Sequence, residues 1–334
     1  MKWYSIQENR SKWRVYNVFL GGRGIGKTYS AIDYVINSGR QFMYLRTTEK
    51  QIDLSCGADR GNPFKKWAAD HNRIIYINKG SDINDVVEET VEEEQPVIKR
   101  LGYACALSTF ENLRGVDFSS IDIILYDEFI QIQPFHFDAF RSFLNLYESV
   151  NRNRELDGMR PVQVFFLANT QEIDNPILIG FNLVTDIDTA IRAGQKKISR
   201  GDFYIELCES VVSRMKEQSV LYRNLDSDDQ YKNEAIHNKF SRNDFSMIGK
   251  PKNLREYAPI CNIDGIGILK HKSRKMFYCS KAVNNKVPYF NSKNQRGLFI
   301  RHYGGALLDA YAAGTLKCDT YITNHKILEI LKII

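Results

Sequence analysis

Eight consecutive residues near the start of the sequence have the types and spacing of a phosphate-binding loop. The stretch Gly21–Thr28 reads GGRGIGKT and matches G-x-x-x-x-G-K-[ST] at every fixed position. In such loops backbone N–H groups surround the phosphates, the lysine reaches the β- and γ-phosphates, and the hydroxyl binds Mg²⁺. We therefore predict a nucleotide site made of the following residues: Gly21, Gly22, Arg23, Gly24, Ile25, Gly26, Lys27 and Thr28.

The segments on either side of this loop provide the structural context that the motif needs. Val15–Leu20 is short and mostly apolar, as a buried parallel strand is. After the loop, Tyr29, Ile32 and Ile36 recur at helical spacing, and Ser38-Gly39 ends the pattern. Strand, glycine loop and helix place the positive helix N-terminus at the phosphates. This context favours a working loop over an ordinary turn that happens to precede a lysine.

A second set of polar residues follows a later apolar stretch. Ile121–Phe129 is typical of a buried strand, and it carries Asp127 and Glu128 near its end. We expect Asp127 to bind Mg²⁺ and Glu128 to polarise a water for attack on the γ-phosphate. Another apolar stretch, 161–170, carries Asn169, which either contacts the γ-phosphate region or caps a turn.

Charge divides the chain into two unequal parts. Residues 1–230 carry 28 Lys and Arg against 33 Asp and Glu, whereas residues 231–334 carry 18 against 7. Such a basic segment is typical of a protein that binds a polyanion such as nucleic acid. Four of its cations crowd the predicted hairpin 266–280 and are the expected DNA contacts: Lys270, Lys272, Arg274 and Lys275.

The order of predicted elements indicates an α/β protein with a mostly parallel sheet and a small basic C-terminal α+β domain. Further strands are expected at 41–47, 73–78 and 102–108, and helices at 62–71, 135–155, 304–314 and 324–334. The acidic stretch 82–96 is interpreted as a solvated face. The expected domains are residues 1–198, a linker or lid at 199–230, and residues 231–334.

Composition excludes several other classes of protein. The sequence has no apolar run of membrane-spanning length and no signal-peptide pattern, so we expect no membrane contact. Its six cysteines form no C-x-x-C pair, which is typical of a reduced intracellular protein without a metal cluster. A GTPase is not favoured, because the stretch 78–82 has one residue too many for the guanine motif N-K-x-D.

Three stretches together carry a family resemblance: GGRGIGKT, ILYDEF (124–129) and NLYESVNRNRE (145–155). With them the chain resembles the DNA-packaging ATPases of small tailed phages of the phi29-like type. These are P-loop ring motors of the additional-strand, catalytic-glutamate class and are related to the large terminases. The resemblance implies ATP and Mg²⁺ as cofactors and a homo-oligomeric ring, by resemblance a pentamer. It also implies double-stranded DNA and the capsid portal as partners, with or without a structural RNA, in the host cytoplasm at the portal.

The resemblance also implies roles for individual arginines and for the C-terminal domain. Arg152 matches the arginine finger that acts on a neighbouring subunit, and Arg154 is its close competitor. Arg46, Arg114 and Arg154 fall at positions linked to subunit coupling. The C-terminal domain is expected to be ribonuclease-H-like, but Lys270 and His271 stand where a metal-binding acid is needed. We therefore expect a DNA-binding remnant without nuclease activity.

Two other functions remain open from the sequence. One is a nucleic-acid-binding scaffold with a weak, regulatory ATPase. The other is a helicase-like remodeller of nucleic acid.

Overall fold

The computed structural model describes residues 3–59, 61–80, 83–113, 115–131, 137–169, 173, 175–226, 229, 232, 236 and 247–332. The chain divides into two compact units. Unit 1 comprises Met1–Gly180 and Asp186–Arg242, and unit 2 comprises Phe181–Thr185 and Asn243–Ile334. Within the described residues, no helix combines the length and apolar character needed to cross a membrane.

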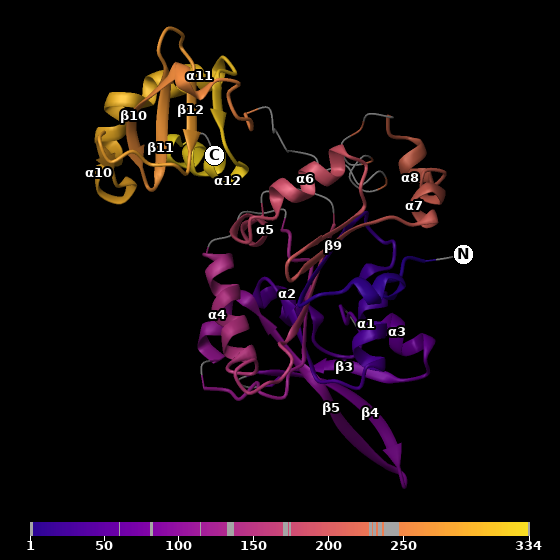
Figure 1. The fold of residues 1–334 in the computed structure, drawn as a ribbon. Helices are drawn as coiled ribbons and strands as arrows, with labels where there is room; N and C mark the ends of the chain where they lie inside the picture. The colour runs from indigo at the N-terminus through magenta and orange to yellow at the C-terminus, as the bar shows by residue number, and fades with distance from the viewer. Residues whose placement is uncertain are drawn as a thin grey trace. The chain divides into compact units, whose positions relative to one another are not determined.

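Unit 1 is built on a sheet whose described strands have the order β3-β4-β5-β2-β6-β7-β1-β9-β8 (Figure 1). The strands from β5 to β9 in this order are parallel to one another. They are β1 (Tyr16–Gly21), β2 (Phe42–Arg46), β5 (Gln95–Ala106), β6 (Ile123–Asp127), β7 (Gln163–Asn169) and β9 (Phe203–Cys208). Because β7 lies between β1 and β6, the sheet has an additional strand between the phosphate loop and the acidic strand end.

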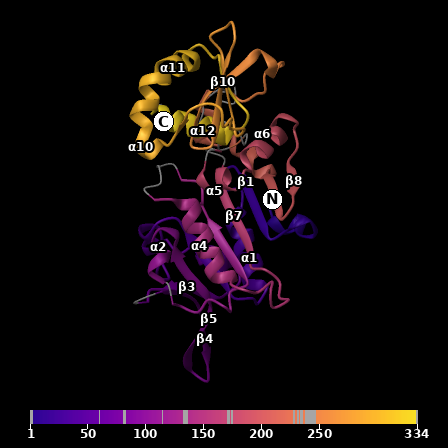
Figure 2. The ribbon, with the colours of Figure 1, turned by 60° about the vertical axis from the view of Figure 1, so that its left-hand side comes forward.

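Helices cover both faces of this sheet, as Figures 1 and 2 show. One face is covered by the 3₁₀ segment η1 (Ile6–Lys12), α1 (Lys27–Asn37) and α3 (Lys65–Asp70), and the other by α4 (Ala139–Asn151) and α5 (Pro176–Gly180). Successive residues of β7 show the two sides. Phe165 packs edge-on against Trp13, whereas Phe166 packs against Phe143 of α4. Side chains alternate along a strand, so a strand buried on both faces is apolar throughout.

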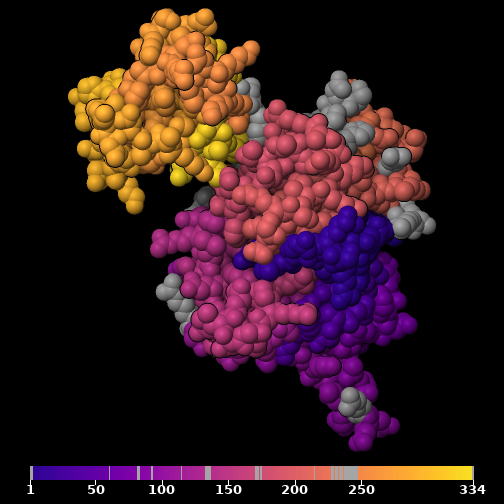
Figure 3. Space-filling model, viewed as in Figure 1, coloured from indigo at the N-terminus to yellow at the C-terminus, as the bar shows by residue number. Residues whose placement is uncertain are grey.

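A long hairpin corrects the interpretation of the acidic stretch 82–96. Residues Asn84–Glu92 form β4, which pairs antiparallel with β5 and with β3 (Ile74–Asn78). The two-residue turn consists of Glu93 and Glu94, and both have positive φ, as in the primed turns that suit hairpins. The hairpin extends from the body of unit 1 (Figures 1 and 3). The turn residues Glu93 and Glu94 are exposed, whereas Asp85, Glu88 and Glu89 are half-buried in a paired strand.

The segment 199–230 is not a linker in the structure. It contains β9, which pairs in parallel with β1 over its whole length, from Tyr16–Phe203 to Gly21–Cys208. Burial of this apolar strand beside β1 places the segment in unit 1, so the boundaries at 198 and 230 differ from the observed division. Strand β8 (Lys197–Arg200) pairs antiparallel with β9. The shorter elements of unit 1 include α2 (Glu49–Ser55), η2 (Leu107–Leu113), α7 (Val211–Lys216) and α8 (Val220–Arg223). Helix α6 (Val184–Arg192) belongs to unit 1 from Asp186 onward, and its first two residues belong to unit 2.

Unit 2 is an α+β unit with a mixed sheet of order β13-β10-β11-β12-β14 among its described residues. Its strands are β10 (Tyr257–Ile263), β11 (Ile266–His271), β12 (Phe277–Ser280), β13 (Tyr289–Phe290) and β14 (Leu316–Cys318). The predicted hairpin 266–280 is therefore confirmed, because β11 and β12 pair antiparallel. Its helices are η3 (Leu254–Glu256), α10 (Ser292–Phe299), the π-helical turn η4 (Ile300–Gly304), α11 (Gly305–Ala312) and α12 (Tyr321–Leu331).

Candidate nucleotide-binding site

The loop Gly21–Thr28 connects β1 to α1, as its flanks predict. Its backbone needs glycine at three positions for two reasons. Gly24 and Gly26 have φ of +61° and +111°, which side chains disfavour. A Cβ on Gly21 would lie 2.7 Å from the carbonyl oxygen of Cys208 in the neighbouring strand β9. Lys27 is the first residue of α1, so the loop ends at a helix N-terminus.

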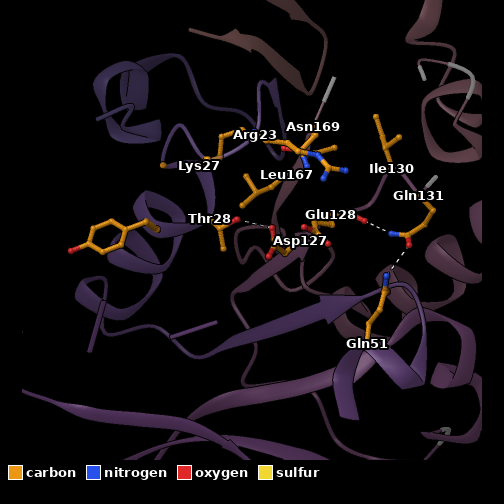
Figure 4. Close-up of a pocket in the computed structure, with 14 residues that line it drawn as sticks. Arg23, Lys27, Thr28, Gln51, Asp127, Glu128, Ile130, Gln131, Leu167 and Asn169 are labelled. Carbon is orange, nitrogen blue, oxygen red and sulfur yellow. Dashed lines mark hydrogen bonds between the residues drawn. The ribbon is translucent and has the colours of Figure 1, made fainter. Parts of the chain in front are cut away.

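A pocket of about 820 Å³ opens beside this loop, at the carboxyl ends of the parallel strands (Figure 4). The acidic end of β6 and the end of β7 line its other walls. Its lining residues are Arg23, Gly24, Gly26, Lys27, Thr28, Tyr29, Gln51, Asp127, Glu128, Ile130, Gln131, Leu167, Ala168 and Asn169. The structure thus brings the loop, the acidic pair and Asn169 together in one cavity.

Lys27 lies within the loop, with its ammonium group held by oxygen atoms. Its Nζ donates to the carbonyls of Gly21 (2.8 Å) and Gly22 (2.7 Å) and to Oδ1 of Asn169 (3.2 Å). Asn169 reaches Lys27 because it pairs with Gly21 in the β1–β7 register. Burial lowers the pKa of Lys27 to about 8, because the charged form is poorly solvated there.

Thr28 and Asp127 supply the hydroxyl and carboxylate oxygens of the pocket. The Thr28 hydroxyl donates to Oδ1 of Asp127 over 2.9 Å, and the Tyr44 hydroxyl donates to Oδ2 over 3.0 Å. Asp127 is only 4% exposed. Burial raises the pKa of its carboxyl group, and the nearby Arg46 guanidinium opposes that rise. A hydroxyl beside a buried carboxylate is a donor set that suits Mg²⁺.

Glu128 occupies the next position in a strained backbone conformation. Its φ is +50°, which is uncommon for a residue other than glycine. Its Oε2 lies 2.5 Å from Nη2 of Arg46, and its carbonyl accepts from the side chain of Gln131. Gln131 in turn accepts from Nε2 of Gln51 over 2.8 Å (Figure 4). The backbone of Glu128 is therefore held by Gln131 of the same segment, and its carboxylate by Arg46 of β2.

Arg46 contacts both acids of the pair. Besides Glu128, its Nη1 lies 3.4 Å from Oδ2 of Asp127 and 3.4 Å from the Tyr44 hydroxyl. Tyr44 and Arg46 are two residues apart on β2, which is paired with β6, so both point to the same side as Asp127. The spacing of two residues between Tyr44 and Arg46 could have indicated from the sequence that Tyr44 also faces Asp127. Gln51 and Gln131 carried no signal in the sequence, because their contacts depend on the fold.

The two arginines after α4 have different surroundings. Arg152 follows the helix with φ of +45°; its side chain is 51% exposed and lies 3.4 Å from Asp117. The Arg154 side chain is 11% exposed and is fixed by Asp122 (2.9 Å) and by the carbonyl of Ser119 (2.6 Å). Neither arginine lines the pocket of its own chain. Arg114 lies outside the described residues.

In unit 2, the four cations of the predicted hairpin lie at or beside the turn between β11 and β12. We call the set Lys270, Lys272, Arg274 and Lys275 the basic turn; all four are exposed. The buried His271 shapes this turn, because its Nδ1 accepts from the backbone N–H groups of Ser273 and Arg274. No group of three or more His, Cys, Asp or Glu in the described part of the chain could hold a metal ion.

Comparison with known proteins extends this picture. The model of the podovirus DNA encapsidation protein (Gp16) family matches residues 1–291. The DNA packaging protein of Bacillus phage PZA is 26% identical over 262 residues, which cover 74% of this chain and 68% of that protein. The DNA packaging protein of Bacillus phage phi29 is 26% identical over 252 residues, which cover 71% and 65%.

A chain in the solved phi29 viral genome packaging motor assembly has the same fold. It matches with a TM-score of 0.63 at 19% identity, over 99% of this chain and 98% of that chain. The match of the family model over most of the sequence decides the assignment. The chain therefore belongs to the podovirus DNA encapsidation protein (Gp16) family.

Proposed function

We propose that this chain is one subunit of a ring, by resemblance a pentamer, that uses ATP and Mg²⁺ to move double-stranded DNA through a capsid portal. The observation that carries the proposal is the single pocket shared by the phosphate loop, Asp127 and Glu128. The motor would act in the host cytoplasm at the capsid. A structural RNA between the ATPase and the portal is compatible with the same site.

Each polar side chain of the pocket has a separate role in ATP binding or hydrolysis. Lys27 and the backbone of the loop bind the phosphates. Asn169, which accepts a hydrogen bond from Lys27, contacts the γ-phosphate region. Thr28 and Asp127 would hold Mg²⁺, which neutralises charge on the phosphates when bound. Glu128 orients and polarises the attacking water. In this structure Arg46 binds Oε2 of Glu128, which leaves Oε1 as the oxygen that would accept a proton from the water.

The arginine finger is assigned to Arg152 rather than Arg154. A finger has to leave its own subunit and contact a neighbour's γ-phosphate. Arg152 is half exposed, and both of its contacts are long: 3.4 Å to Asp117 and 3.3 Å to the carbonyl of Ser149. Two shorter contacts hold Arg154, which is mostly buried, inside its own chain. Asp122, which binds Arg154, precedes β6, and Asp127 ends it. The two acids are about 17 Å apart at about 3.3 Å per residue. Arg154 is therefore bound at the amino end of β6, at the edge of the sheet away from the nucleotide pocket.

A test of the proposed function is the stimulation of hydrolysis by its partners. We expect the ATPase rate of the full chain to rise when double-stranded DNA and empty capsids with portals are added together. A scaffold with a regulatory ATPase would show a low rate that capsids leave unchanged. A helicase-like remodeller would respond to nucleic acid alone and would separate strands.

ATP binding should weaken above about pH 8. The pKa of Lys27 is about 8 without nucleotide, and phosphates beside the ammonium would raise it. Binding then requires protonation of Lys27 at higher pH, so affinity should fall by up to about tenfold per pH unit. Calorimetric titration with an ATP analogue between pH 6.5 and 9.5 measures this. Lys27→Arg, whose guanidinium stays charged, should bind more weakly but without the pH step. An affinity that is flat to pH 9.5 in the wild type would refute the assignment.

The basic turn should grip DNA through phosphates without reading bases. Changing all four of its cations to Gln should weaken duplex binding by the full chain and flatten the salt dependence. Each lost phosphate contact should reduce the slope of log affinity against log salt by about 0.9. Basal ATPase activity should stay unchanged, because the pocket lies in unit 1. A matched control neutralises four exposed lysines elsewhere in unit 2: Lys281, Lys286, Lys293 and Lys326. Equal slopes for both variants would show that the turn has no special role.

A further inference from the structure

A second cavity lies at the edge of the sheet in unit 1 opposite to the phosphate loop. Its volume is about 470 Å³, and its lining residues are Arg10, Trp13, Tyr34, Ser38, Arg40, Arg160 and Gln163. Trp13 precedes β1, Arg40 precedes β2, and Arg160 precedes β7. These strands are parallel, so the cavity lies at their amino ends, whereas the nucleotide pocket lies at their carboxyl ends.

Three arginines line this cavity, and the guanidinium groups of two of them lie over one aromatic ring. Arg10 and Arg40 lie 5.1 and 5.8 Å from the centroid of the Tyr34 ring. Arg40 also donates to the Tyr34 hydroxyl over 2.5 Å and to Oε1 of Gln163 over 3.4 Å. Among the described residues, no Asp or Glu forms an ion pair with Arg10, Arg40 or Arg160.

Three arginines without acidic partners in one cavity favour the binding of an anion. Like charges in one cavity repel one another, and a bound anion relieves that repulsion. The helix α1 ends at Asn37, so its negative C-terminal end accounts for one nearby cation such as Arg40, but not for three. Arginine forks match the geometry of oxyanions and bind them with two hydrogen bonds each. Arg40 is held in place before any ligand arrives, which reduces the entropy lost on binding.

The aromatic residues indicate which part of the ligand is bound. Trp13 and Tyr34 are buried and packed edge-on against each other, with ring centroids 4.8 Å apart. The guanidinium groups lie over Tyr34, so the ring is not free to stack on a base. Recognition would therefore be through phosphates and independent of sequence. The surrounding residues 1–230 are net acidic, which makes this cavity a local positive site.

We propose that the cavity formed by Arg10, Arg40 and Arg160 binds backbone phosphates of a nucleic acid, at a site separate from the basic turn. The ligand is a duplex, DNA or RNA, that runs across the amino edge of the sheet. Arg10 and Arg160 are exposed, so their side chains can adjust to a phosphate, whereas the half-buried Arg40 is held by its hydrogen bond to Tyr34. The nucleotide pocket shares no lining residue with this cavity.

The test uses the full chain with the basic turn changed to Gln, so that the remaining nucleic-acid binding is measured alone. Into this background we introduce Arg10→Gln with Arg160→Gln, which leaves the contacts of Arg40 intact. Affinity for short duplex DNA and duplex RNA is measured by fluorescence anisotropy over a range of salt. The control carries Lys65→Gln and Lys99→Gln, two exposed charges elsewhere in unit 1.

We expect the arginine pair to lower affinity for one duplex at least tenfold and to reduce its salt slope by about two, since each phosphate contact contributes about 0.9. The duplex, DNA or RNA, whose affinity falls more is identified as the ligand whose phosphates the cavity binds. Thermal unfolding and basal ATPase activity should match the control. Arg160→Lys should keep the slope of its parent but lower affinity, because the fork is lost.

Three results would overturn the proposal. Equal affinities for the arginine pair and the lysine control would show that the cavity does not contact nucleic acid. Binding of inorganic phosphate without any effect on duplexes would show a small-anion site only. Loss of self-association with unchanged duplex affinity would assign the arginines to an acidic surface of a second copy. Should the double variant unfold, Arg160→Gln alone tests the proposal, because the Arg160 side chain makes no hydrogen bond or ion pair with the described residues.

Discussion

Glu128→Gln is expected to bind ATP as the wild type does and to hydrolyse it about 10²- to 10⁴-fold more slowly, the range typical of a lost general base. The amide has the shape of the carboxylate but cannot accept a proton from water. The phosphate loop, Thr28 and Asp127 stay intact, so nucleotide affinity should be kept. Single-turnover hydrolysis and equilibrium binding of ATP, measured on the same preparation, separate the two effects.

Glu209 provides a matched control for this variant. Its side chain is 49% exposed and paired with Lys196, much as the Glu128 side chain is 51% exposed and paired with Arg46. Glu209→Gln removes the same charge outside the pocket and should leave turnover near the wild-type rate. If Glu128→Gln also hydrolyses ATP at close to the wild-type rate, another group activates the water, and the catalytic assignment is wrong.

Arg152→Ala is expected to reduce turnover by roughly 10³-fold or more, as loss of an arginine finger does. Because the finger would act on the neighbour, the defect should be repaired by mixing. Subunits with Arg152→Ala and subunits with Glu128→Gln are each inactive alone. A mixed ring contains some interfaces where an intact Arg152 faces an intact Glu128, and these should hydrolyse ATP. Turnover is measured against mixing ratio, with rings verified by native mass spectrometry.

Arg154→Ala is the paired control for the finger. It breaks the contacts with Asp122 and Ser119 and leaves Asp122 without this partner. We therefore expect a loss of thermal stability without a defect that mixing repairs. If Arg154→Ala subunits, rather than Arg152→Ala subunits, restore turnover when mixed with Glu128→Gln subunits, Arg154 is the finger. No rescue at any ratio, in verified rings, would count against action across the interface.

The sequence predicted the core of the site because its signals are local. The loop Gly21–Thr28 contains its own glycines, lysine and hydroxyl within eight residues, and its flanking strand and helix are short periodic patterns. The acids at the end of β6 were found in the same way. Their meeting in one pocket follows from the rule that parallel strands present their carboxyl ends at one edge. The mostly parallel sheet was also predicted from the order of elements, whereas the additional strand was implied by the family resemblance.

What the sequence could not show depends on pairing between distant segments. The stretch 84–92 is rich in acids, which are depleted in strands, yet it is held as a strand by β3 and β5 on either side. The apolar start of the expected linker became part of the sheet through pairing with β1. The contact between Arg46 and Glu128 and the bridge from Gln51 to Gln131 join residues about 80 positions apart. No spacing rule reaches so far.

The most direct test of the central claim, that ATP hydrolysis at this pocket drives DNA into a capsid, measures DNA entry and ATP consumption together. Purified chain, empty capsids with portals and double-stranded DNA are mixed with ATP, and DNase-protected DNA is counted beside released phosphate. We expect protected DNA to accumulate in proportion to phosphate released with the wild type, and neither to accumulate with Glu128→Gln. Protected DNA that accumulates equally with Glu128→Gln, or with an ATP analogue that cannot be hydrolysed, would contradict the account.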